Sequence, residues 1–205
     1  MNYKKGCFLF LYKGGELYLV IDFSALDFNN AILVLRNLDG TAIQTLGYAN
    51  KIKINPLYNE ISELTFEIPS KVDGINTPNY DKIVGLRIID YLGIGQFILK
   101  NPIITNDGIK EIKSCKAYSL EFEFTYKKIS LASSTYCLWN PASPNGSIVQ
   151  YILDILPNWS LGGCDASLIG KYRTFSINDE NVYNFIKSTV QDKYSCIFTF
   201  DTYNR

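Results

Sequence analysis

The chain has 205 residues, with twenty basic and twenty acidic side chains that give a formal net charge of zero. Its length accommodates one or two domains and its 47% hydrophobic content can bury a core, but no basic surplus is available to bind phosphates. Histidine is absent, which excludes Ser–His–Asp triads, Cys–His dyads and histidine-based zinc sites.

Most of the first 130 residues predict antiparallel strands joined by tight turns. Glycine-containing pairs such as Asp39-Gly40 and Asp107-Gly108 are typical of hairpin turns, and the segment 106–108 (Asn-Asp-Gly) is the strongest of them. Residues 69–79 carry two prolines and a glycine, which favours a loop or a short helical crossover. The predicted strands are 8–12, 17–23, 32–35, 42–46, 52–54, 61–68, 86–91, 96–99, 103–105, 109–116 and 120–126.

The pattern changes near residue 130. Ser147 can cap a helix that runs to about residue 156, where Pro157 ends it. A second helix is expected to begin at Asn178 or Asp179 and to bury a stripe that includes Val182 and Phe185. Short strands are expected at 171–175 and 195–201, and the last resembles the first half of a hairpin whose partner is absent, as in a fragment of a longer protein.

These elements predict a mainly β protein with an α+β part. Residues 1–130 are expected to form an antiparallel β-barrel domain, and residues 131–205 a smaller α+β domain that is incomplete at its C-terminus. No stretch approaches the roughly 20 apolar residues of a membrane helix, so we expect no membrane insertion. The apolar run 7–12 is too short for a signal peptide and is interrupted by the segment 13–15.

Few residues suggest chemistry. The five cysteines form no C-x-x-C pair, which favours buried free thiols in a reducing compartment; they are Cys7, Cys115, Cys137, Cys164 and Cys196. Glu121 and Glu123 would lie about 7 Å apart on one face of a strand, near the glycosidase spacing, but a solvated strand face explains them fully. The sequence therefore predicts no catalytic, cofactor-binding or metal-binding residue and no enzyme activity.

From residue 33 onward, the order of several short motifs resembles a known family. The residues that carry this likeness are 35–40 (LRNLDG), 59–69 (NEISELTFEIP), 95–99 (GQFIL), 115–121 (CKAYSLE), 152–153 (IL), 158–162 (NWSLG), 173–175 (RTF), 181–185 (NVYNF) and 196–201 (CIFTFD). The pattern is similar to the N-terminal region of the phage minor structural or prophage tail (endopeptidase-tail) proteins. The resemblance implies a fold similar to the baseplate hub of contractile-tailed phages, a trimeric ring with tail-tube-like β-barrels. Peptidase activity in this family belongs to variable C-terminal regions, and no catalytic residue is carried over.

The expected function is thus that of a virion structural protein in a phage or prophage tail tip, assembled in the cytoplasm of the bacterial host. The resemblance implies a homotrimeric hub that joins the tail tube to the distal tip, with the distal tail protein, the tube and the tape measure protein as partners. Two alternatives stay open. One is a tail-associated cell-wall-degrading enzyme, and the other is a carbohydrate-binding receptor module that uses exposed tyrosines with Trp139 or Trp159.

Overall fold

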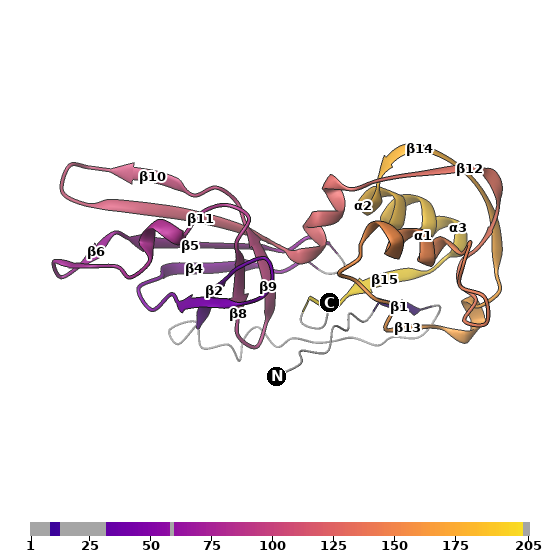
Figure 1. Cartoon of the computed structure of the whole chain (residues 1–205), viewed down its shortest axis with the longest axis horizontal. Helices are drawn as coiled ribbons and strands as arrows, with labels where there is room; N and C mark the ends of the chain where they lie inside the picture. The colour runs from indigo at the N-terminus through magenta and orange to yellow at the C-terminus, as the bar shows by residue number, and fades with distance from the viewer. Residues whose placement is uncertain (1–8, 13–31, 58–59, 203–205) are drawn as a thin grey trace. The chain divides into compact units, whose positions relative to one another are not determined.

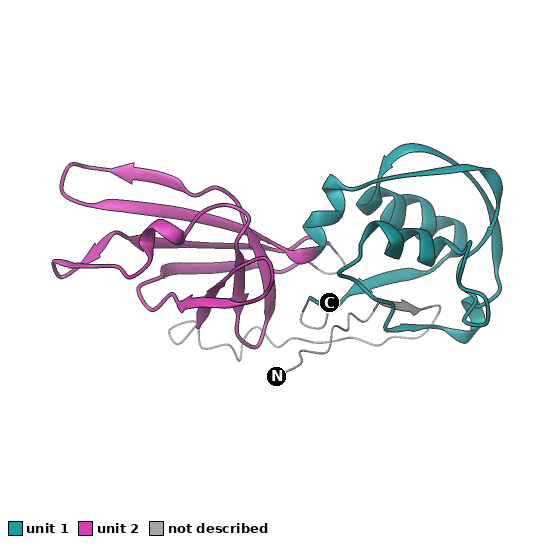
Figure 2. Ribbon diagram, viewed as in Figure 1, with its two compact units in different colours: residues 1–18, 121–205 teal, residues 19–120 magenta. Residues whose placement is uncertain are grey.

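A computed structural model describes residues 9–12, 32–57 and 60–202, with the backbone alone for residues 9–12. The chain divides into two compact units, one of residues 1–18 and 121–205 (unit 1) and one of residues 19–120 (unit 2), as Figure 2 shows. The division of unit 2 from the second part of unit 1 falls between Leu120 and Glu121, whereas the sequence pattern changes near residue 130.

Unit 2 is built on one antiparallel sheet (Figure 1). Its strands follow one another in the order β3-β2-β8-β9-β11-β5-β4, and β10 pairs with the part of β11 that β9 leaves open. The strands are β2 (Leu33–Arg36), β3 (Ala42–Thr45), β4 (Asn50–Asn55), β5 (Glu63–Pro69), β8 (Ile88–Tyr91), β9 (Gly95–Leu99), β10 (Ile103–Asn106) and β11 (Glu111–Ser119).

The chain connectivity makes this sheet curl. Strands β3 and β4 lie at opposite edges of the hydrogen-bonded order, yet only the turn 46–49 joins them along the chain. A turn of this length spans at most about 17 Å, so the two edges must approach one another. The result is a half-barrel, and the prediction of a mainly β fold with an α+β part is confirmed.

The concave side of the half-barrel holds the core of unit 2. On β5, Leu64, Phe66 and Ile68 are buried while the residues between them are partly exposed, so the predicted two-residue period of this strand is confirmed. Each such side chain stabilises the fold by about 1.5–3 kcal/mol. The cluster also contains Leu33, Leu35, Leu46, Ile83, Ile89, Tyr91, Phe97, Leu99, Cys115 and Ala117.

Residues 69–79, expected to form a loop or a helical crossover, contain a small hairpin. Strand β6 (Lys71–Val72) pairs with β7 (Ile75–Asn76) across Asp73 and Gly74. Both turn residues have positive φ, 49° and 79°, as a type I′ turn requires. A short 3-10 helix, η3 (Tyr80–Lys82), follows this hairpin.

Unit 1 combines two small sheets with helices. Strands β12 (Lys128–Cys137) and β14 (Tyr172–Asn181) form a long antiparallel ribbon. A three-stranded sheet has the order β13-β1-β15, from β13 (Gly163–Cys164), β1 (Leu9–Tyr12) and β15 (Ile197–Phe200). The helices are η4 (Leu120–Tyr126), α1 (Ile148–Ile155), η5 (Ala166–Leu168) and a run of α2 (Val182–Asn184), η6 (Phe185–Val190) and α3 (Gln191–Tyr194).

Local capping explains where the helices of unit 1 begin. The Ser147 side chain accepts a hydrogen bond from the backbone N–H of Gln150, so the predicted cap of α1 is confirmed. The second helix begins at Val182 and not at Asn178 or Asp179, because the segment before it still pairs with β12.

Two strand predictions fail because tertiary contacts override the local pattern. Residues 120–126 form the 3-10 helix η4, in which Leu120 and Phe124 are buried while Tyr126 is exposed. The predicted hairpin of residues 8–12 with 17–23 is not formed by β1, since its two edges pair with β13 and β15; residues 17–23 lie outside the described part. The final strand β15 therefore has a partner, β1, within this chain.

Candidate functional site

The carboxylate pair considered for acid–base chemistry does not share a face. Side chains two positions apart on a 3-10 helix point about 120° apart, so η4 separates Glu121 from Glu123. Glu121 is buried, and Glu123 accepts a hydrogen bond from the indole N–H of Trp159. This arrangement packs the pair into unit 1 and gives it no glycosidase geometry.

The cysteines of the described residues are free thiols with low reactivity. Burial raises the pKa of Cys115 and of Cys196 to about 12 each, and burial followed by the nearby Asp165 carboxylate raises the pKa of Cys164 to about 11. The thiolate, which is the nucleophile, is therefore scarce at neutral pH. Cys7 lies outside the described residues. Within the described part of the chain, no three His, Cys, Asp or Glu side chains gather as a metal site would require.

Trp159 is not available to stack on a sugar. It is buried in unit 1, where its ring packs edge-on against Phe124 and Phe200 with centroids 4.6 and 6.0 Å apart. Trp139 is partly buried. Across the described residues, no helix has the length and apolar character needed to cross a membrane.

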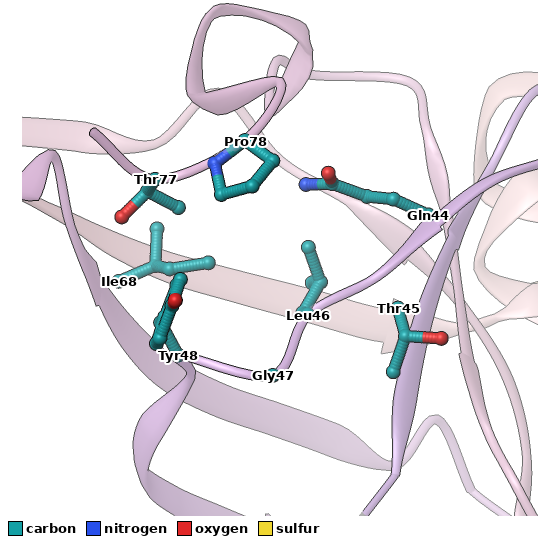
Figure 3. Close-up of a pocket in the computed structure, with 8 residues that line it drawn as sticks. All are labelled: Gln44, Thr45, Leu46, Gly47, Tyr48, Ile68, Thr77 and Pro78. Carbon is teal, nitrogen blue, oxygen red and sulfur yellow. The ribbon is translucent and has the colours of Figure 1, made fainter. Parts of the chain in front are cut away.

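A small open hollow lies on unit 2, between the turn after β3 and the segment after β7 (Figure 3). It encloses about 140 Å³. Its floor is formed by the buried side chains of Leu46 and Ile68, and Gly47, Tyr48 and Pro78 form an exposed rim. The remaining lining residues are Gln44, Thr45 and Thr77, so no Asp, Glu, Lys or Arg side chain lines the hollow. This composition suits an apolar group and not an ion.

The feature of unit 2 with the largest exposed apolar surface is a hairpin that we call the β10–β11 ribbon (residues 103–114). It projects beyond the body of the sheet, next to the β6–β7 hairpin (Figure 1). All four residues of β10 are exposed, and Ile103 and Ile104 have exposed fractions of 68% and 57%. Because neighbouring strand residues point to opposite faces, each face of the ribbon presents an isoleucine.

The turn at the tip of the ribbon is rigid. Asp107 Oδ1 accepts hydrogen bonds from the N–H groups of Lys110 and Ile109, at 2.7 and 2.9 Å, and these bonds lower the pKa of the Asp107 carboxyl group. Asn106 Oδ1 accepts a third bond from Gly108, whose φ of 86° favours glycine. The turn thereby holds Ile109 with 95% of its surface exposed.

The β6–β7 hairpin adds another isoleucine at the same end of the sheet. The backbone N–H of Ser70 donates to the carbonyl of Glu111 at 2.8 Å, which ties the base of this hairpin to the ribbon. Ile75 on β7 is 65% exposed. Exposed isoleucines gathered on two hairpins, with the outer edge of β10 left unpaired among the described strands, are typical of a protein-binding surface.

Lys113 anchors the base of the ribbon. Its buried ammonium group donates to the carbonyls of Tyr80 and Ile83 at 2.7 and 2.9 Å and lies over the Tyr80 ring at 4.4 Å. Burial lowers the pKa of Lys113, so these bonds compensate a desolvation cost. They fasten the η3 segment to β11.

We expect Lys113→Ala to destabilise unit 2 by about 2–3 kcal/mol, because two buried carbonyls would lose their donor. Urea unfolding followed by far-UV circular dichroism would measure this loss. Lys110→Ala, an exposed lysine on the same ribbon, is the matched control and should cost under about 0.5 kcal/mol. Equal stabilities of the two variants would show that Lys113 does not anchor the ribbon.

Sequence analysis missed the ribbon as a site. The run Ile103-Ile104 resembles a core strand, and periodicity does not reveal which strand remains at an edge. The available signal was Ile109, an isoleucine directly after a strong Asn-Asp-Gly turn, where polar residues are usual.

Comparison with solved structures identifies the architecture. The fold resembles that of a prophage tail protein. Prophage tail protein gp18 from Listeria monocytogenes EGD-e superposes with a TM-score of 0.54 and 12% sequence identity, over 83% of this chain and 50% of that one. The chain thus spans half the length of that structure, and at this identity the likeness shows a shared fold. No family model matches the chain, and no curated protein matches it.

Proposed function

We propose that this chain is a structural component of a phage or prophage tail, where it forms a trimeric hub that joins the tail tube to the distal tip. The observation that carries this proposal is the fold likeness to a prophage tail protein, which covers most of the chain. The order of the tail-family motifs along the sequence supports it independently.

In this proposal the half-barrel of unit 2 is the tube-like element of the hub. A ring subunit needs a stable core on one side of its sheet and apolar contacts for its neighbours on the other elements. The core cluster supplies the first, and the exposed isoleucines of the two hairpins supply the second. Unit 1 would be the α+β part that accompanies this barrel.

The proposed role is scaffolding and involves no catalytic step. The carboxylates, thiols and tryptophan considered for chemistry or sugar binding are largely packed into the fold. The partners would be further copies of the chain, the tail tube, the distal tail protein and the tape measure protein. The protein would be assembled in the bacterial host cytoplasm and end in the virion tail.

The oligomeric state tests the trimeric part of this proposal. We expect sedimentation velocity across micromolar concentrations to show a species of three copies in equilibrium with the 23.3 kDa chain. A chain that remains monomeric throughout this range would contradict a self-assembling hub. A stable dimer would contradict the threefold ring.

A further inference from the structure

The exposed tip of the β10–β11 ribbon and the hollow of unit 2 are complementary in shape and polarity. We propose that Ile109 of one copy inserts into the hollow of a second copy, and that this contact joins neighbouring subunits. The inference rests on the proposed function, since it assigns the contact by which a hub would assemble.

Ile109 has the properties of a docking residue. Its side chain is almost wholly exposed, so it does not fill the hollow of its own chain. The three side-chain-to-backbone hydrogen bonds of the turn fix its position before any partner arrives. A group held in this way loses little conformational freedom on binding, which favours affinity.

The hollow fits an aliphatic side chain. A cavity of about 150 Å³ lined by apolar side chains accepts a benzene molecule, and the hollow encloses about 140 Å³. Leu46 and Ile68 give it an apolar floor, and its rim carries no charge that an isoleucine would desolvate. Water held in the hollow would leave when the side chain enters, which is the usual source of hydrophobic affinity.

A second copy is the occupant that the molecule itself supplies. The ribbon tip and the hollow belong to the same unit, so every copy carries one of each. Insertion of a tip from one copy into a different surface of the next is a heterologous contact, and such contacts generate rings when the rotation closes. An apolar side chain entering a surface pocket of a neighbouring molecule is sufficient to join protein subunits.

Isotope-coded photocrosslinking locates the contact directly. A diazirine-bearing aliphatic residue of isoleucine size would replace Ile109, and labelled and unlabelled copies of the 205-residue chain would be mixed and irradiated. We expect crosslinks between copies that join the tip to peptides carrying residues 44–48 or 77–78. Crosslinks from tip to tip, or to any other surface, would overturn the proposal while a trimer in sedimentation would leave the hub standing.

Two substitutions test the same contact from its two sides. Ile109→Asp places a charge on the tip, and Gly47→Phe fills the hollow, since a Cβ atom at Gly47 meets open space. Each should weaken self-association roughly tenfold or more, and the double variant should be little weaker than either single one. Leu38→Asp, at an exposed leucine of another turn in unit 2, is the control and should leave association unchanged.

The outcomes separate the inference from the hub. Unchanged association in both Ile109→Asp and Gly47→Phe, with the trimer intact, would overturn the insertion alone. A wild-type chain that gives no crosslink between copies and stays monomeric would overturn both. Equal weakening by Leu38→Asp would show that added charge and not loss of the tip is responsible, which also overturns the insertion.

Discussion

Replacing Arg36 by alanine should destabilise unit 2 by about 3–5 kcal/mol. The Arg36 guanidinium on β2 contacts Asp90 Oδ2 on β8 through Nε at 2.9 Å and through a second nitrogen at 2.8 Å. Asp90 is only 3% exposed, so removal of the arginine leaves a buried carboxylate without its counter-charge. Hydrogen-exchange mass spectrometry of peptides from β2 and β8 would measure the loss of local stability.

Two controls separate burial from charge pairing. The double variant Arg36→Met with Asp90→Leu removes both charges and should recover most of the lost stability, since buried pairs replaced by apolar residues are often neutral. Lys116→Ala breaks a pair with Glu63 whose side chains are both partly exposed, and it should cost under about 1 kcal/mol. An Arg36→Ala variant as stable as Lys116→Ala would show that Asp90 does not depend on Arg36.

Phe175→Ala should destabilise unit 1 by about 3–5 kcal/mol, because it leaves a cavity at the centre of an aromatic cluster. Phe175 lies on β14 and is 1% exposed. Its ring centroid is 5.8 Å from that of Phe185 and 5.9 Å from that of Tyr194, so the ribbon and the helix run meet at this side chain. Both tryptophans of the chain belong to unit 1, so guanidinium unfolding followed by tryptophan fluorescence reports this unit selectively.

Matched variants on the same strand define the contribution of the cavity. Phe175→Leu keeps most of the buried volume and should cost less than the alanine variant. Tyr172→Ala, at an exposed end of β14, should change the unfolding free energy by about 0.5 kcal/mol or less. A Phe175→Ala loss no larger than that of Tyr172→Ala would show that the cluster does not hold unit 1 together.

Turns and single-face patterns were the most predictable parts of the fold. The Asn-Asp-Gly turn, the alternating strand β5 and the capped helix α1 were predicted because their causes are local: positive φ at glycine, a two-residue period and a side-chain acceptor at the first turn. The fold class followed from the number of such strands.

Pairings between distant segments were not predictable. Strand β1 was expected to pair with the next segment along the chain, but it lies between β13 and β15. The segment 120–126 alternates as a strand does, yet burial of Leu120 and Phe124 fits a helical turn equally well, and packing decides between the two. One sequence shows periods but not partners.

The candidate surface shows the same division. The absence of histidine correctly directed attention from catalysis towards assembly, but the segment Ile103-Ile104 gave no sign that both side chains would remain exposed. Exposure depends on where the sheet ends, and the sheet ends at β10 because β9 and β10 share the same edge of β11. That arrangement is a property of the whole sheet.

The most direct test of the tail assignment is immunogold electron microscopy of particles released after prophage induction in the source strain, with an antibody raised against this chain. We predict gold label at the distal end of the tail, on intact particles or on partly disassembled ones. Label absent from intact and disassembled tails alike would contradict the proposal that this chain is part of a tail.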